Sequence, residues 1–291
     1  MAGSVLFDAP GPKTAARHRL YALLTYAALA GLVALFVWRM QASGQLDYER
    51  HWEVFLTPAY LEVLLSGLVD TLQMAAVAIV LAVVFGLVFG VGKLSEHRWL
   101  RWPSWLVVEF FRAVPVIILM IFLASAFSYG DGPLSRFWCV VLALTLYNGA
   151  VLAEVFRAGI NAVPRGQVEA AYALGMRKSQ VMGQIQLPQA VKTMLPALIS
   201  QCVVALKDTS LGAIIVAPGL TYVYDQITGE FRNQVAATLV VTAIYVTVNL
   251  LLTALATWVQ RRYVGERRPL AFDTGRDGVV TLPRPEEDRS R

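Results

Sequence analysis

Six long apolar runs follow one another along the chain, and polar segments separate them. They cover about residues 20 to 38, 64 to 92, 104 to 127, 137 to 156, 195 to 217 and 235 to 260. A helix needs about 20 mostly apolar residues to cross the roughly 30 Å of hydrocarbon in a bilayer. The pattern therefore predicts an all-α membrane protein with six transmembrane helices.

Composition agrees with this prediction. Hydrophobic residues make up 57% of the 291 residues and charged residues only 15%, whereas soluble domains carry about 25% charged residues.

We find no repeat and no low-complexity linker inside residues 20–262, so we expect one membrane domain there, after a short segment 1–19. The run 20–38 is longer than the apolar part of a signal peptide, so we expect an uncleaved anchor. Residues 263–291 are rich in proline, glycine and mixed charge, which predicts a disordered tail.

The positive charges lie on alternate sides of the six runs. Segments 1–19, 93–103, 157–193 and 261–291 hold 19 lysines and arginines, whereas the intervening segments hold 4. Because loops rich in lysine and arginine stay in the cytoplasm, this imbalance predicts that both termini are cytoplasmic. The net charge of +5 thus reflects topology, and it gives no reason to expect nucleic-acid binding.

Residues 163–188, called the elbow below, form a polar stretch on the predicted cytoplasmic side. Pro164 and Gly166 mark the end of one helix and the start of another, and good helix formers follow over 167–174. Gly175 suits the left-handed position that closes a helix.

A second short helix is expected over 178–187, and we expect Pro188 to stop it because proline disrupts a helix interior. Two to eight residues would be enough to connect two membrane helices. A rigid pair of short helices in this place therefore indicates a docking surface for a soluble partner.

The elbow also contains a sequence motif that resembles one in a known protein family. The order Glu169-Ala170-Ala171, three residues, Gly175, nine residues, Ile185, one residue and Leu187-Pro188 resembles the cytoplasmic loop of permease subunits of bacterial ABC importers. Other stretches resemble the polar amino acid branch of that family: Tyr147-Asn148, Ala153-Glu154, Arg157-Ala158-Gly159-Ile160, Leu187-Pro188-Gln189-Ala190, Glu109 to Pro115 and Lys207 to Leu211. The resemblance covers about residues 60–262, and Leu146-Tyr147-Asn148 and Arg177 to Gln180 look most like glutamate-type permeases.

The resemblance implies a five-helix permease core over 60–262, preceded by one extra N-terminal helix, in a bacterial inner membrane. It also implies that the elbow is a coupling helix, which docks on a cytoplasmic ABC ATPase dimer through Glu169, Ala170, Ala171 and Gly175. The further partners implied are a second permease subunit, related or identical, and an extracytoplasmic solute-binding protein. ATP and magnesium would bind the partner ATPase, and no cofactor is expected on this chain.

Polar residues inside the apolar runs are the candidates for a translocation path, because such residues usually face the bundle or water. They are Glu109, Arg112, Asn148, Glu154, Lys207, Asp208, Thr209 and Ser210. A structural role is the alternative for two pairs, since Glu109 with Arg112, and Glu154 with Arg157, have the i, i+3 spacing of helical ion pairs. Adjacent Lys207 and Asp208 point about 100° apart on a helix, which favours a functional role, as do the neighbouring hydroxyls.

No catalytic grouping is visible in the sequence. The stretch nearest to a phosphate-binding loop, Gly86 to Lys93, has Leu87 and Leu94 where the motif needs glycine and serine or threonine. The energy for transport must then come from a partner or from an ion gradient. An ion-coupled secondary transporter is therefore the second hypothesis, although the inverted halves typical of that class are not visible. Basic Arg112 and Lys207 make an acidic amino acid a reasonable substrate.

Overall fold

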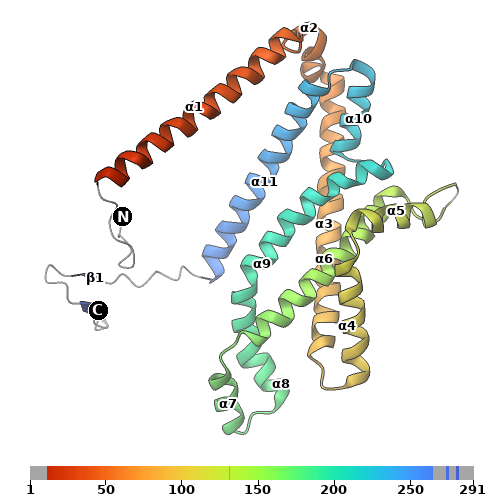
Figure 1. The fold of residues 1–291 in the computed structure, drawn as a ribbon. Helices are drawn as coiled ribbons and strands as arrows, with labels where there is room; N and C mark the ends of the chain where they lie inside the picture. Colours follow the sequence, from red (N-terminus) through yellow and green to blue (C-terminus); the bar gives the residue numbers. More distant parts are fainter. Residues whose placement is uncertain (1–11, 131, 265–272, 275–279, 282–291) are drawn as a thin grey trace, which may run out of the picture. The chain divides into compact units, whose positions relative to one another are not determined.

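The computed structural model describes residues 12–130, 132–264, 273–274 and 280–281, and nearly all of them are helical (Figure 1). The elements are α1 (Pro12–Ala42), α2 (Tyr48–His51), η1 (Glu53–Leu56), α3 (Pro58–Leu94), α4 (Arg98–Ala113), α5 (Val116–Phe127), α6 (Arg136–Asn161), α7 (Arg165–Ala173), α8 (Lys178–Gln180), η2 (Val181–Gln186), α9 (Leu187–Asp208), η3 (Thr209–Ile215), α10 (Leu220–Phe231), α11 (Gln234–Val264), β1 (Asp273–Thr274) and β2 (Val280–Thr281). The two short strands pair with each other. The rest of the predicted disordered tail lies outside the described residues.

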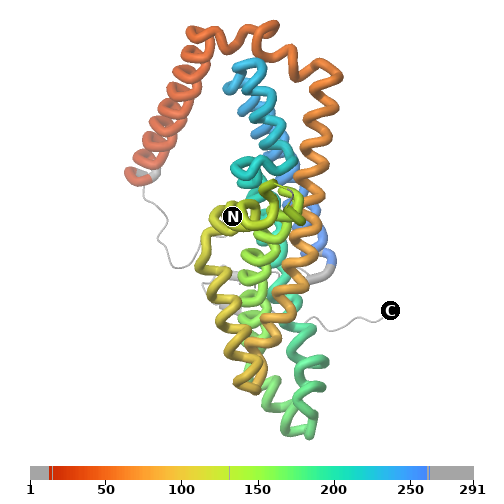
Figure 2. Tube along the Cα trace, turned by 90° about the vertical axis from the view of Figure 1, so that its right-hand side faces the viewer, coloured from red at the N-terminus to blue at the C-terminus, as the bar shows by residue number. Residues whose placement is uncertain are grey.

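Five of the six predicted spans are single helices long and apolar enough to cross a membrane. The third predicted span, 104–127, is not one straight helix. It consists of α4 and α5, which meet at an angle of 98° (Figure 2). Val114 is extended, with φ −79° and ψ 125°, because the ring of the following Pro115 disfavours a helical residue before it. The six-span count holds only if this bent pair is taken as one span.

The second half of the elbow also differs from the prediction. Pro188 does not stop a helix, because a helical path runs from Lys178 to Ile215 without a break. The turn before the proline widens into a π-helix over Val181–Gln186, and Pro188 then stands in the first turn of α9. A proline is tolerated in a first turn, where its missing N–H leaves no hydrogen bond unmade.

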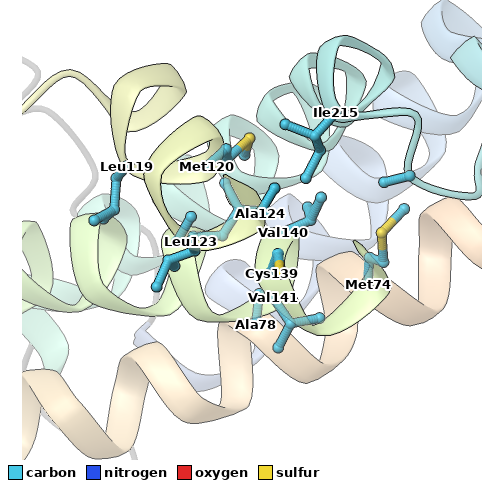
Figure 3. Close-up of a cluster of buried hydrophobic side chains, with 13 residues drawn as sticks. Met74, Ala78, Leu119, Met120, Leu123, Ala124, Cys139, Val140, Val141 and Ile215 are labelled. Atoms are coloured by element: carbon cyan, nitrogen blue, oxygen red, sulfur yellow. The ribbon is translucent and has the colours of Figure 1, made fainter. Parts of the chain in front are cut away.

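The chain divides into two compact units. The larger unit consists of residues 71–217 with 245–291. Its central helix is α6, because 67% of the most apolar 18-residue stretch of α6 is buried. Helices α4, α5 and α9 all pack on α6. Figure 3 shows the main cluster of buried side chains, which come from α3, α5, α6 and η3: Met74, Ala78, Leu119, Met120, Leu123, Ala124, Cys139, Val140, Val141 and Ile215.

Glycines of α3 allow α6 to approach it closely. A Cβ atom added to Gly86 would lie 2.8 Å from the Leu152 Cβ atom, and one added to Gly90 would lie 2.9 Å from the Ala153 carbonyl oxygen. Contacts of this length leave no room for a side chain. The two glycines therefore serve helix packing, as small residues do in membrane bundles.

The smaller unit comprises residues 1–70 with 218–244. Within it, the side chain of Val223 in α10 lies against Gly67 of α3, and the ring of Tyr60 meets that of Phe231 edge to face at 5.1 Å. The buried Asn233 donates a hydrogen bond of 3.1 Å to the carbonyl of His51. These contacts hold α10 and the short helix α2 to the start of α3 and α11.

Candidate functional site

The first half of the elbow closes in the way that the sequence predicts. Gly175 has φ +78°, the left-handed conformation that glycine adopts without steric cost. The Gly175 N–H donates to the Tyr172 carbonyl at 2.9 Å, and the Met176 N–H donates to the Ala171 carbonyl at 3.2 Å. This pair of hydrogen bonds is a Schellman motif, so α7 ends in a defined and rigid turn.

The elbow presents one face to its surroundings and buries another. Glu169, Ala170 and Gly175 are exposed, and Leu174 beside them is 84% exposed. Ala171 is buried, and its neighbour Val168 packs on the cluster that includes Met194 of α9 and Phe156 of α6. Three of the four predicted docking residues are therefore accessible, whereas Ala171 is buried.

The elbow is also tied to the loop between α3 and α4. Lys178 at the start of α8 forms an ion pair with Glu96 in that loop. Both side chains are largely exposed, so water and salt weaken the attraction. The hydrogen bond from Lys178 holds the pKa of the Glu96 carboxyl below its usual value.

Three helices meet at a network of five charged side chains. Lys93 of α3 donates to Glu109 of α4 at 3.2 Å and to Glu154 of α6 at 2.8 Å. Arg112 lies 3.4 Å from Glu109, and Arg157 pairs with Glu154. The Lys93 side chain is only 6% exposed, so it depends on both carboxylates for the hydrogen bonds that water would otherwise supply. The network therefore locks α3, α4 and α6 together.

Two pockets flank this network, and Glu154 lines both of them. One, of about 430 Å³, is lined by Arg112 and Tyr147 among others. The second, of about 390 Å³, is lined by Lys93, Arg101 and two tryptophans of α4. Volumes of this size suit small-molecule ligands. The structure thus brings together three of the predicted path residues, Glu109, Arg112 and Glu154.

Asn148 lies apart from that group. Its side-chain amide donates to the Leu144 carbonyl at 3.0 Å, and its amide oxygen accepts a hydrogen bond from Gln201 of α9. The two residues line an apolar pocket of about 70 Å³. Asn148 is therefore a buried polar link between α6 and α9.

The remaining predicted path residues stand where α9 changes into the 3₁₀ helix η3. Thr209 is buried and donates to the Leu206 carbonyl at 2.6 Å, while the Ser210 hydroxyl donates to the Lys207 carbonyl at 2.7 Å. These hydroxyls bond the helix backbone in the described conformation. Lys207 is exposed and Asp208 is partly buried, and the structure places neither in the pockets beside Glu154.

Sequence reasoning missed two members of these groups. Lys93 was assigned to a loop, yet its side chain is the centre of the charged network. A lysine directly after an apolar run, with acidic residues inside two other runs, was the available signal. Gln201 was missed as well, although a glutamine inside an apolar run is itself a sign of a polar partner.

Comparison with known proteins gives a consistent result. Residues 82–265 match the family described as the inner membrane component of binding-protein-dependent transport systems. The chain is 44% identical over 227 residues to the glutamate transport system permease protein GluD of Corynebacterium glutamicum, covering 77% of this chain and 83% of the relative. It is 30% identical to the glutamate/aspartate import permease protein GltK of Escherichia coli O157:H7, covering 74% of this chain and 99% of that protein.

Solved structures show the same fold. A crystal structure of an amino acid ABC transporter with histidines matches with a TM-score of 0.66 and 29% identity, over 70% of this chain and 95% of the other. A structure of the MetNI methionine ABC transporter in an inward-facing conformation matches with a TM-score of 0.61 at 20% identity, over 71% and 99% of the two chains.

These findings confirm the predicted fold class and the prediction of a transport subunit rather than an enzyme. They favour the ATP-driven importer over the ion-coupled secondary transporter. Proteins of this kind work with an ATPase and a binding protein. The chain belongs to the family of inner membrane components of binding-protein-dependent transport systems, and it is a permease subunit of an ABC importer.

Proposed function

We propose that this permease imports a polar amino acid, with glutamate or a similar acidic amino acid favoured. The relative at 44% identity is a glutamate permease, and a second relative is a glutamate/aspartate permease. The chemistry of the larger pocket supports the same choice, because the Arg112 guanidinium lines it and guanidinium groups bind carboxylates in a two-pronged geometry.

The elbow is the proposed docking site for the ATPase dimer, and its geometry is the observation that carries the mechanism. Its exposed face holds Glu169, Ala170 and Gly175, with Leu174 projecting beside them. Its opposite face packs on α6 and α9 through Val168, and Ala171 beside it is buried. When the ATPase subunits move, a rigid elbow that packs on α9 would therefore transmit the movement and displace α9 as a rigid body.

The proposed translocation path combines the charged network with the polar residues of α6 and α9. Arg112 and Glu154 line the larger pocket, Glu109 and Glu154 line the smaller one, and Asn148 links α6 to α9. Lys207, Asp208, Thr209 and Ser210 would line the path further along, at the junction of α9 and η3. A change in the position of α9 would alter both groups, since α9 packs on α6 and continues into η3.

The proposed assembly places both termini in the cytoplasm, on the strength of the 19 to 4 distribution of basic residues. A second permease, either another copy or a related chain, would complete the path. The partner ATPase would bind ATP and magnesium, and no cofactor is proposed on this chain, because Leu87 and Leu94 interrupt the nearest phosphate-loop pattern.

Uptake by proteoliposomes tests the proposed function. The chain would be reconstituted with its partner permease, the ATPase and the solute-binding protein, and uptake of labelled glutamate would be measured with and without ATP. We expect uptake that requires all partners and that falls when unlabelled glutamate or aspartate competes. Uptake that continues without the ATPase, driven by an ion gradient, would contradict the proposal.

A charge reversal tests the docking site separately. Glu169→Lys changes an exposed side chain, so it should leave membrane insertion unchanged while it lowers ATP-dependent uptake at least tenfold. Arg165→Gln, also exposed and on the same short helix α7, is the matched control and should retain most uptake. Normal uptake in the Glu169 variant would remove the assigned role of this residue.

A further inference from the structure

The first half of α4, at the end of a membrane span, is rich in tryptophan and arginine. It reads Arg98-Trp99-Leu100-Arg101-Trp102-Pro103-Ser104-Trp105. Trp102 is 64% exposed and Trp105 is 47% exposed, whereas Ser104 is buried. Tryptophan and arginine on the outer face of a helix are typical of the level at which a membrane meets water.

This segment is held firmly against the end of α3. The Ser104 hydroxyl donates to the Leu100 carbonyl at 2.8 Å, and a Cβ atom added to Gly92 would lie 2.2 Å from the Ser104 oxygen. A side chain at position 92 would therefore displace the Ser104 hydroxyl from this position. The helix segment that carries the tryptophans is therefore held in place, so less conformational entropy is lost when they bind a ligand.

The pocket of about 390 Å³ beside α4 carries one charge that its neighbours do not balance. Two cations that line it, Lys93 and Arg157, pair with the two lining carboxylates, Glu109 and Glu154. Arg101 also lines the pocket, and it forms no ion pair with any described residue. The pocket thus offers a guanidinium group, beside two exposed indole rings, to an anion.

We propose that Arg101, Trp102 and Trp105 form a binding site for the headgroup of an anionic phospholipid. The guanidinium would bind the lipid phosphate, and the indole N–H groups would donate to phosphate or ester oxygens. The acyl chains would continue along the exposed apolar face of α4, where Leu106 and Phe110 are 49% and 57% exposed.

The position of the pocket favours a lipid over a soluble ligand. Its two tryptophans lie at the outer surface of α4, at the boundary between a polar segment and an apolar run. The inference does not depend on the proposed substrate. Under the proposed topology, the site would lie in the cytoplasmic leaflet, which carries the anionic lipids.

Quenching of tryptophan fluorescence by brominated lipids tests this site. The complete transporter would be reconstituted in phosphatidylcholine bilayers, with brominated phosphatidylglycerol or brominated phosphatidylcholine as the quencher. The ratio of quenching by the two lipids measures selectivity for the anionic headgroup. Replacing Trp102 and Trp105 by phenylalanine identifies the part of the signal that comes from the pocket.

We expect the wild-type transporter to prefer phosphatidylglycerol, and Arg101→Gln to lower that preference about fivefold, the usual effect of one basic residue near a membrane. Arg101→Lys should retain most of the preference. Arg39→Gln is the matched control, because Arg39 follows the exposed Trp38 at the end of α1, and it should leave the preference unchanged.

Three results would overturn the proposal. The first is equal selectivity in the wild type and the Arg101→Gln variant. The second is an equal loss in the Arg39→Gln variant, which would indicate a general effect of charge. The third is displacement of the lipid signal by soluble glycerol phosphate or by glutamate, which would indicate a site for free anions. Loss of glutamate uptake alone would bear on the transport function and not on this site.

Discussion

The ammonium group of Lys93 donates a hydrogen bond of 2.8 Å to Glu154, and this contact joins the end of α3 to the central helix α6. The two residues are 61 positions apart in the chain. The same ammonium group reaches Glu109 of α4 at 3.2 Å. The three helices that line the pocket of about 390 Å³ thus depend on one buried cation.

Replacing that cation should loosen the helices. We expect Lys93→Met to lower the free energy of unfolding by about 2 to 4 kcal/mol, because removal of one partner from a buried ion pair leaves an uncompensated charge. The lower part of this range is favoured, since Glu154 and Glu109 are partly exposed and retain Arg157 and Arg112. Thermal unfolding of the purified protein in detergent would measure the loss.

Arg112→Gln is the matched control for the lysine variant. It removes a cation that is 39% exposed and lies 3.4 Å from Glu109, so it should cost about 1 kcal/mol or less. A double variant with Lys93→Met and Glu154→Gln should recover part of the lost stability. Equal unfolding midpoints for the Lys93 and Arg112 variants would show that burial of the lysine has no structural importance.

The left-handed turn at Gly175 should be necessary for coupling. A β-branched residue at φ +78° is strained by about 1 to 2 kcal/mol, so Gly175→Val should distort the end of α7 without affecting the membrane helices. We expect normal insertion, with the amount of substrate taken up per ATP hydrolysed reduced severalfold. Gly166→Ala, also on the elbow and with the same open space around its Cβ position but without a positive φ, should behave as the wild type. Unchanged coupling in Gly175→Val would argue against a rigid elbow.

The close contacts of the α3 glycines with α6 predict that replacing glycine by alanine lowers stability here, whereas it usually raises the stability of a helix. In an exposed helix, replacing glycine by alanine stabilises by about 1 kcal/mol. Gly86→Ala should instead destabilise by about 1 to 3 kcal/mol, since the new methyl group would lie 2.8 Å from Leu152. Gly31→Ala on α1, where nothing lies within 4 Å, should be neutral or stabilising. Unfolding midpoints of the two variants, compared with the wild type, would decide, and a shift of the same sign in both would contradict the packing argument.

The ion pair between Glu96 and Lys178 predicts a dependence on pH. Because the folded protein lowers the pKa of Glu96, the pair contributes stability at pH values above the ordinary carboxyl pKa of 4.5. That contribution is lost as the pH falls through the lowered pKa of the folded state. Hydrogen exchange in α7 and α8 should thus be faster in Glu96→Gln than in the wild type at neutral pH.

The same two proteins should exchange alike in strong acid, where both lack the carboxylate charge. High salt should also reduce the difference at neutral pH, because both side chains are exposed. Glu49→Gln, a change of an exposed carboxylate in the short helix α2, serves as the control. A difference between Glu96→Gln and the wild type that persists in acid would show that the amide itself, and not the lost charge, alters the elbow.

Features that depend on neighbouring residues were predictable. The apolar runs located the membrane helices but not all of their ends, since α1 begins at Pro12 and the helical path of the fifth span begins at Lys178. The runs could be found because their length alone decides whether a helix can cross a bilayer. The left-handed Gly175 was predictable for a similar reason, since helix termination is a local event. The stop at Pro188 was wrong, because a π-helical turn over Val181–Gln186 accommodates the proline within a continuous helical path.

The sequence by itself determined that this is a helical membrane protein with a rigid polar elbow, since apolar length, local helix preference and glycine conformation are properties of adjacent residues. Only the tertiary structure decided which polar groups meet. Lys93 finds its partners 16 and 61 residues away, and Asn148 finds Gln201 at a separation of 53. Such pairs depend on how helices rotate and pack, and the same apolar patterns are compatible with many rotations. The charged network around Lys93 and the pocket of the proposed lipid site therefore follow from packing and not from the order of residues alone.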